Sequence, residues 1–556
     1  MKRKFIVVFA LIAAFCLLPL SGCFSKRISE GGEYVVQIRN LKAGYGDEWL
    51  YEAVDLFNDM YEADGYSARV EESSAGITTD EVVAQTKDYQ NNNVDLYIVT
   101  GGAGLLKLVD ASPQILRTNE YTLMEDLSGI YSSNAIGLDK KEESGTIGGK
   151  MSDISKLYTQ YYGKLEDWQG TPFLYQWTSA SSGFLYNQEV LNDYGITEVP
   201  RTTTEFKEAF DKILSEGKAD SVYPVSWGGD NASGYWQYPT ETWYAQYVGE
   251  DAYLDFYRLK PKTGTTLENG WSVYDDEGWL YALENLETFC DTDYAAPGTL
   301  TTVDHLGAQD LFLKGKAAFC TTGDWMYNEM HKDPAYSESI GDIRVMRLPV
   351  VSQLGTKLNL HSDPDTCDDI LSEIIKGVDE NDTNEEIISA VKAAYSVTLT
   401  DDQVKAVRQA RGVYYDLGYQ HQAFIPYHSD AKEPAKLFLR FIASNDFQTV
   451  YREKAHGNLP FDYTLADGET LTEYQKSLDV LTHSENSVGI CEANHLSEIR
   501  AAAGITAVPS VGAWVTLIKG MAADSNGYTA SEIYQKNLQS VSGDNWTLLL
   551  ETAGLA

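Results

Sequence analysis

The sequence predicts an α/β fold that begins with a mostly parallel sheet covered by helices. From residue 34 onward, segments of strand character alternate with segments of helical character. The run Val94–Gly102 reads as a continuous apolar strand that ends in glycines, which is typical of a strand buried on both faces. The 556 residues contain no internal repeat or low-complexity tract and suffice for at least two lobes with hydrophobic cores.

The alternation is clearest in the first part of the chain. Further strands are expected at Tyr34–Arg39 and Ala68–Glu71, and helices at Glu48–Tyr61 and Asp80–Tyr89. Ligands of such sheets bind at the carboxyl ends of the strands. We therefore single out Tyr45, which follows the first strand, and Thr100, which ends the third.

The middle of the chain continues the pattern. Two extended runs joined by small residues are expected at Thr171–Asn187 and a strand at Tyr223–Trp227, and helices at Trp236–Val248 and Glu277–Phe289. Thr202 and Glu205 form a capping-box pattern in front of a further amphipathic helix.

Residues 352–422 differ from their surroundings. Asp, Glu, Asn and Thr dominate much of this stretch, and capping boxes at Thr383 and Thr400 begin polar helices, so we interpret it as an inserted helical module. The acidic run at Asp363 lacks the central glycine and the terminal glutamate of a calcium loop, and we expect a turn or a helix cap there. From Ala431 onward helices dominate, and a capping box at Thr529 begins the last long one.

The chain start resembles the signal segment of bacterial lipoproteins. Three basic residues precede the apolar stretch Phe5–Leu20, whose 16 residues are too few for a comfortable membrane span. The sequence Leu20-Ser21-Gly22-Cys23 then resembles a lipobox. The resemblance implies cleavage before Cys23, diacylglycerol on its sulfur, a short tether over residues 23–33, and attachment to the outer face of the cell membrane.

Charge and cysteine usage narrow the classes of function. The net charge of -39 becomes -42 once residues 1–22 are removed, and such a surface repels nucleic acid. Four cysteines follow Cys23 without zinc spacing, so we expect buried thiols rather than a disulfide framework. No motif predicts a metal or another cofactor.

Several motifs resemble, in family order, the extracellular solute-binding proteins of sugar-importing ABC transporters. Leu311–Met330 contains a Gly-Lys-Ala turn, a strand and then Gly-x-Trp, and Gly183–Phe206 contains the series from Tyr-Asn to Glu-Phe. Gly341–Val350 contains a strand that ends in Leu-Pro. Glu433–Pro460 contains a helix pair that ends in Gly-x-Leu-Pro. The resemblance implies a periplasmic-binding-protein-like fold, with two α/β lobes joined by a hinge and a ligand cleft between them. It places lobe 1 at residues 34–180 and 423–485 and lobe 2 at residues 181–351 and 486–556, with residues 352–422 as a departure from the family.

The same resemblance implies a lipid-anchored receptor, monomeric, that captures an oligosaccharide for an ABC permease and carries out no chemistry itself. Aromatic rings cover the apolar face of a sugar, and polar side chains bind its hydroxyl rim. Trp325 matches the family tryptophan that stacks on sugar, and Asp324 is placed to bind hydroxyls or to cap the helix. Trp514 matches an aromatic family position near the cleft, with core packing as the alternative.

Further candidates come from the residues themselves. The Gly-rich, aromatic stretch from Ser226 to Tyr238 supplies Trp227, Asp230, Tyr235 and Trp236, again with packing as the alternative for the tryptophans. Trp177 lies in an expected crossing segment and is a candidate for either the site or the hinge core.

Three other functions are alternatives to a sugar receptor. A surface glycoside hydrolase needs two carboxyl groups at a defined separation, which 82 acidic residues alone do not predict. A glycan-docking lipoprotein built of helical repeats disagrees with the alternating strands. A receptor of the same fold for a solute other than sugar stays open, although 11 Trp and 37 Tyr favour sugar.

Overall fold

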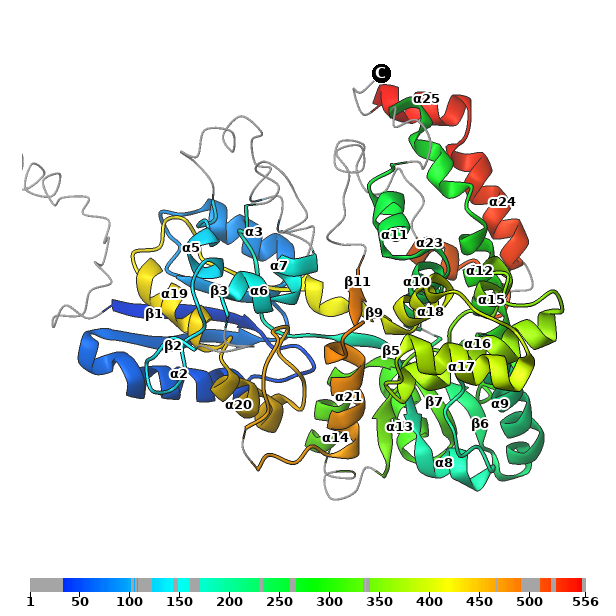
Figure 1. The fold of residues 1–556 in the computed structure, drawn as a ribbon. Coiled ribbons are helices and arrows are strands. Elements are labelled where there is room, and N and C mark those ends of the chain that lie inside the picture. The colour runs from blue at the N-terminus through cyan, green and yellow to red at the C-terminus, as the bar shows by residue number, and fades with distance from the viewer. Residues whose placement is uncertain are drawn as a thin grey trace, which may run out of the picture.

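The protein consists of two α/β lobes that lie side by side, each built around its own sheet (Figure 1). The structure is a computed structural model that describes residues 34–101, 123–143, 149–160, 171–229, 234–260, 267–333, 341–466, 468–491, 511–521 and 527–552, together with Leu105, Leu108 and Tyr336.

Lobe 1 contains five strands in the order β2-β1-β3-β10-β4. Its strands are β1 (Tyr34–Leu41), β2 (Tyr66–Ser74), β3 (Leu96–Thr100), β4 (Tyr175–Gln176) and β10 (His421–Phe424), and its helices are α2 (Glu48–Tyr61), α3 (Thr79–Lys87), α5 (Ser128–Tyr131), α6 (Met151–Ile154), α7 (Lys156–Gln160), α19 (Lys432–Phe441) and α20 (Asn445–Ala455). The first three strands are parallel, as predicted, whereas β10 runs antiparallel to both β3 and β4.

Helices cover both faces of this sheet. On one side α2, α19 and α20 share a core with β1 that includes Ile38, Phe57, Phe438 and Tyr451. On the other side Val82 of α3 belongs to the same core as Tyr97 and Val99 of β3. A sheet covered in this way leaves only its strand ends and loops for a ligand.

Lobe 2 contains the strands β11-β9-β5-β7-β6, with β8 also paired to β5. Its strands are β5 (Ser181–Asn187), β6 (Tyr223–Ser226), β7 (Ala317–Gly323), β8 (Ile343–Val345), β9 (Val413–Asp416) and β11 (Val488–Ile490). Its helices are α8 (Gln188–Asp193), α9 (Thr203–Gly217), α10 (Gln237–Val248), α11 (Glu250–Tyr257), α12 (Glu277–Phe289), α13 (His305–Leu313), α14 (Trp325–Lys332), α21 (Glu473–His483), α23 (Val511–Val515), α24 (Ala530–Val541) and α25 (Asp544–Thr552), with a 3₁₀ helix η6 (Leu267–Tyr274).

Alternate residues of β7 enter different cores. Phe319 packs with Phe206 and Phe210 of α9 on one face of the sheet. Cys320 joins Met326 of α14 and Leu478 of α21 on the other face. The helix α21 therefore packs on lobe 2, which differs from the expectation that residues up to 485 belong to lobe 1. The repeat of two along a strand explains why one short segment serves both cores.

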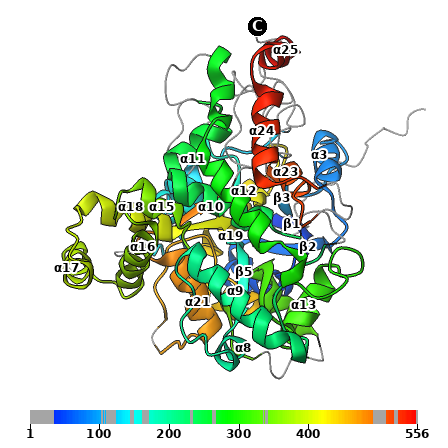
Figure 2. The ribbon, with the colours of Figure 1, turned by 90° about the vertical axis from the view of Figure 1, so that its right-hand side faces the viewer.

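The expected helical module is present but shorter than residues 352–422. It comprises α15 (Gln353–Lys357), α16 (Pro364–Asp379), α17 (Asn384–Tyr395) and α18 (Asp401–Gly412), and Figure 2 shows it at one side of lobe 2 with α17 outermost. Both predicted capping boxes are confirmed, and Asp363 caps α16, as expected of a turn or cap. Residues 413–424 are not helical insertion, because they supply β9 to one sheet and β10 to the other.

The segments that cross between the lobes are tied together by one buried carboxylate. Residues 177–180 lead from β4 to β5, and the 3₁₀ helix η8 (Leu417–Gln420) leads from β9 to β10. The Oδ1 atom of Asp416 accepts hydrogen bonds from the amides of Ala180 (2.9 Å) and Gly418 (2.8 Å), and Leu417 donates to the carbonyl of Ala180. A third crossing connects α20 to α21.

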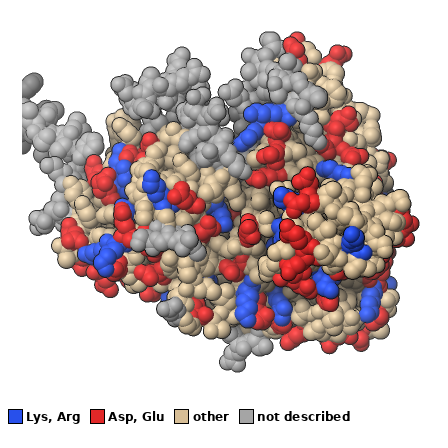
Figure 3. Space-filling model, in the orientation of Figure 1, with Lys and Arg blue, Asp and Glu red and all other residues tan. Residues whose placement is uncertain are grey.

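The remaining expectations concern cysteines and membranes. Cys290, Cys320, Cys367 and Cys491 are free and buried, which confirms the prediction of buried thiols. Within the described ranges, none of the helices combines the length and the apolar character that a membrane span requires. Figure 3 shows acidic side chains over both lobes, interspersed with Lys and Arg.

Candidate ligand site between the lobes

The lobes meet where the loop after β1 faces the start of α14. Asn328 of α14 donates its side-chain amide to the carbonyl of Gly44, and Lys332 lies 3.9 Å from the carboxylate of Glu48. The loop follows the carboxyl end of β1, and α14 follows that of β7, so both sides of the contact occupy the strand ends at which such folds bind ligands.

Trp325 is the half-buried aromatic residue at the centre of this contact. A Cβ atom at Gly44 of lobe 1 would lie 2.8 Å from Trp325, and one at Gly323 of lobe 2 would overlap the six-membered ring of the indole. The absence of a side chain at both glycines thus leaves room for the indole between the lobes. The ring of Tyr235 meets it edge-on, with centroids 6.0 Å apart.

Tyr235 begins a row of aromatic rings that leads away from Trp325. Its φ of +63° is a left-handed conformation that aromatic residues seldom adopt, and strain of this kind collects at functional sites. Tyr238 stacks on it at 5.7 Å, and Tyr415 of β9 lies 4.7 Å beyond Tyr238. Sequence reasoning missed Tyr238 and Tyr415. No helical spacing signals Tyr238, because Tyr235 lies before the start of α10 and has a left-handed backbone.

Asp324 occupies the N-cap position of α14 but makes no capping hydrogen bond with its side chain. Its carboxyl group is 1% exposed and accepts from the hydroxyl of Tyr45 at Oδ1 and from the hydroxyl of Ser181 at Oδ2 (2.9 Å). Burial, with a smaller contribution from nearby Asp416, raises the pKa of Asp324 to about 7 despite these hydrogen bonds. The expected capping of the helix by this side chain is therefore wrong, and its two carboxyl oxygens accept from hydroxyl groups of the protein itself.

The three candidates from lobe 1 and the crossing segment lie in different environments. Tyr45 is 1% exposed and meets the ring of Trp177 edge-on at 6.1 Å. Trp177 stacks on Trp49 at 5.2 Å and donates its indole N–H to the carbonyl of Val99, so its contacts are those of hinge core. Thr100 is half-buried at the end of β3, opposite His421 of β10.

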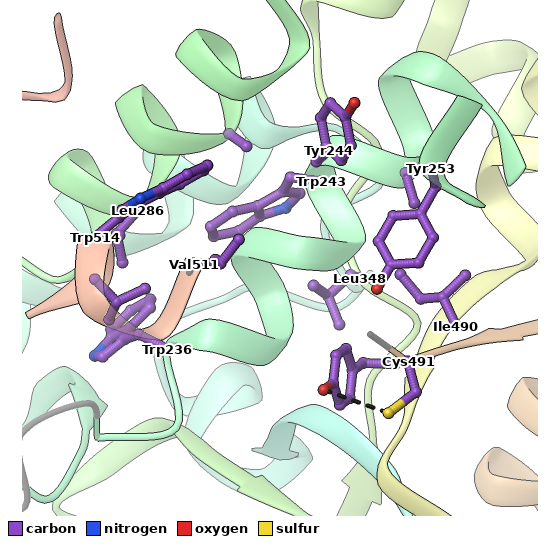
Figure 4. Packing of buried hydrophobic residues seen from close by; sticks show 14 of the residues in the cluster. Trp236, Trp243, Tyr244, Tyr253, Leu286, Leu348, Ile490, Cys491, Val511 and Trp514 are labelled. Carbon is purple, nitrogen blue, oxygen red and sulfur yellow. Dashed lines mark hydrogen bonds between the residues drawn. The ribbon is translucent and has the colours of Figure 1, made fainter. Parts of the chain in front are cut away.

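Trp227, Trp236 and Trp514 are buried in lobe 2, where packing is the role that their contacts support. Trp227 meets Trp236 edge-on at 6.1 Å, and Trp514 packs against Trp279 at 5.0 Å. Figure 4 shows Trp236 and Trp514 among apolar neighbours of this core. The candidates Asp230 and Cys23 lie outside the described residues.

Two α/β lobes, joined by crossing segments and meeting over a half-buried tryptophan, define a clamp-like binding protein. The chain belongs to the bacterial extracellular solute-binding proteins, whose family profile matches residues 143–449. This family consists of binding proteins that work outside the cell.

Solved structures agree on the fold. A chitin oligosaccharide binding protein shares 13% identity with a TM-score of 0.57, over 94% of this chain and 99% of that one. The raffinose complex of the solute-binding protein RafE shares 10% identity with a TM-score of 0.53, over 91% and 100%. A probable secreted solute-binding lipoprotein from Streptomyces coelicolor shares 12% identity with a TM-score of 0.54, over 91% and 98%. Among curated proteins, none matches the chain.

Proposed function

We propose that this protein captures an oligosaccharide outside the cell and delivers it to an ABC permease, without catalysing a reaction. The observation that carries the proposal is the half-buried indole of Trp325, held between two lobes beside Tyr235. Flat rings with partly polar surroundings suit the weakly apolar faces of sugars. The sugars named for proteins of the same fold, a chitin oligosaccharide and raffinose, favour this ligand class.

The proposal includes a lipid anchor on Cys23, which the lipobox-like sequence Leu20–Cys23 supports. Acyl chains on this cysteine would hold the receptor beside its permease and raise its effective concentration there. Ligand binding would shift the lobes further toward the closed form, because only that form contacts the ligand from both sides. Trp325 and Tyr235 are the residues to which we assign ligand contact, with Thr100 as a lobe 1 contributor.

Thermal unfolding in the presence of single sugars tests the function. We would screen chito-oligosaccharides, raffinose and xylo-oligosaccharides, because a ligand at 100 times its Kd adds about 2.7 kcal/mol to the stability of the folded state. Trp325→Ala should abolish the shift produced by the sugar that binds. Trp271→Ala, which removes another half-buried tryptophan, in η6, should keep it. Chromatography of the same mixtures should recover the sugar intact.

Two outcomes would contradict the proposal. A panel without any stabilising sugar would remove the ligand class, and shortened sugar chains after incubation would indicate a hydrolase instead. An unchanged shift in Trp325→Ala would leave the ligand class standing but would remove Trp325 from the site.

A further inference from the structure

We propose that Tyr45 and Asp324 form a latch that holds the two lobes closed around the position of Trp325. The inference deepens the proposed function, because it assigns to two buried residues the task of coupling lobe closure to the ligand-stacking ring. Asp324 thereby acts as a positioning residue and not as a ligand contact.

The latch joins elements of different lobes. Tyr45 belongs to the loop between β1 and α2 in lobe 1, whereas Asp324 connects β7 to α14 in lobe 2. The hydroxyl of Tyr45 donates to Oδ1 of Asp324 and also lies 3.0 Å from the carbonyl oxygen of Ser179 in the crossing segment. One hydroxyl group of lobe 1 therefore contacts both lobe 2 and the crossing segment that leads to it.

The surroundings fix both partners of this hydrogen bond. On the lobe 2 side, Ser181 donates to Oδ2 of Asp324, and the hydroxyl of Tyr474 donates to its main-chain carbonyl (2.7 Å). On the lobe 1 side, the ring of Tyr45 packs against Trp177 and Tyr451. Burial and the nearby Asp324 hold the pKa of Tyr45 well above its usual value, so the phenol keeps the proton that it donates.

The position of the latch gives it a task beyond packing. Asp324 immediately precedes Trp325, and Tyr45 immediately follows Gly44, the residue against which the indole rests. When the hydrogen bond forms, the loop and the helix start that flank the indole come to their closed positions together. A buried hydrogen bond to a carboxyl group is strong enough to bias such an equilibrium.

Tyr45→Phe tests the latch, because it removes one hydroxyl group and retains the ring. In small-angle X-ray scattering of the sugar-free protein, we expect a larger radius of gyration than for the wild type. Affinity for the sugar that stabilises the wild type in the panel of chito-oligosaccharides, raffinose and xylo-oligosaccharides should fall about tenfold. Asp324→Ala should open the lobes as well, and adding Tyr45→Phe to it should have no further effect, since both remove the same bond.

Tyr175→Phe is the matched control. Tyr175 is equally buried, and its hydroxyl donates to the carbonyl of Leu439 (2.9 Å) within lobe 1. This variant should lose stability but keep the wild-type radius of gyration and affinity. A wild-type radius of gyration in Tyr45→Phe would overturn the latch. If no sugar of the panel binds the wild type, the proposed ligand class fails while the scattering comparison still decides on the latch.

Discussion

His331 of α14 and His456, which follows α20, stack across the two lobes with ring centroids 4.3 Å apart and ring planes 24° apart. Tyr327 lies against both rings, at 4.6 and 5.7 Å. Burial, with added repulsion from His331 and Lys332, lowers the pKa of His456 to about 4. Protonation of His456 costs the hydration of its charge and places that charge near Lys332, so acid weakens this contact between the lobes.

We expect His456→Asn to make stability less sensitive to acid. A histidine whose pKa is lowered from 6.5 to about 4 stabilises the folded state fully above pH 6.5, and this contribution is lost as the pH falls toward 4. Asparagine suits the left-handed backbone at this position, where φ is +56°. Between pH 7 and pH 5 the variant should lose about 1 kcal/mol less free energy of unfolding than the wild type in urea titrations.

His305→Asn is the control for this experiment, because His305 begins α13 and is half-buried elsewhere in lobe 2. This variant removes a histidine that lies outside the stacked pair, so comparing it with His456→Asn isolates the effect of that pair. Asp324 acts in the opposite direction, because burial raises its pKa to about 7 and its ionisation costs stability as the pH rises. The quantity to compare is therefore the difference in the free energy of unfolding between variant and wild type. If this difference stays constant from pH 7 to pH 5, the prediction is contradicted.

Gly323→Ala should disturb the candidate site directly. A Cβ atom at this position overlaps the indole of Trp325, which would have to leave its place between the lobes. We expect at least a tenfold loss of sugar affinity, equivalent to about 1.4 kcal/mol, in isothermal titration. Gly129→Ala, where a Cβ meets no atom within 4 Å, should leave affinity unchanged. Equal affinities for the two variants would show that sugar binding does not require the indole in its present position.

The regular elements were predictable because their signals are local. The helices Glu48–Tyr61 and Glu277–Phe289 begin and end at the predicted residues, since each segment carries an amphipathic repeat and Asp276 caps the second one. The strands β9 and β10 were not recognised, because they are short and their partners β5 and β3 lie more than 200 residues away in sequence. Pairing at such separations leaves no local pattern, and the predicted insertion was too long as a result.

The prediction that α21 belongs to lobe 1 was wrong for a related reason. The apolar stripe of this helix predicts a buried face but not the sheet that buries it, and Leu478 packs with residues of lobe 2. The same limit holds for the site. The family motif Gly-x-Trp placed Trp325 just after a strand end. The residue type alone does not distinguish Trp325 from Trp227 and Trp236, which are buried. The contact between Tyr45 and Asp324 joins residues 279 positions apart, which only the fold brings together.

Asp416→Ala should destabilise the protein strongly through the crossing segments. The carboxylate of Asp416 is buried and accepts from the amides of Ala180 and Gly418, which would lose their partner in the interior. Burying unsatisfied amides costs about 1–3 kcal/mol each, so we expect a loss of about 3 kcal/mol in the free energy of unfolding. Asp55→Ala, an exposed acid on α2, should change it by less than about 0.5 kcal/mol. A similar small loss for both variants, measured in urea, would contradict the role of Asp416.

The helical module should depend on one arginine for its attachment to lobe 2. Arg411 of α18 is almost fully buried and binds both carboxylate oxygens of Asp379 at 2.8 and 3.0 Å, and it donates to the carbonyl of Leu348 at 2.9 Å. Arg347 binds the same carboxylate at 3.0 Å. The guanidinium group therefore connects α16, α18 and the chain that leaves β8, at a point where little water can replace its hydrogen bonds.

Arg411→Met keeps much of the apolar length of the side chain but leaves the carbonyl of Leu348 without this donor and Asp379 with one arginine instead of two. We expect a loss of about 3 kcal/mol in the free energy of unfolding, since breaking a buried ion pair from one side is costly. Lys405→Met, which removes an exposed pair with Asp401 in the same helix, should leave the free energy of unfolding almost unchanged. Urea unfolding of both variants makes the comparison, and faster hydrogen exchange in α16–α18 than in α9 should accompany the loss in Arg411→Met. Equal stability of the two variants would mean that the shared apolar core, and not the arginine, holds the module in place.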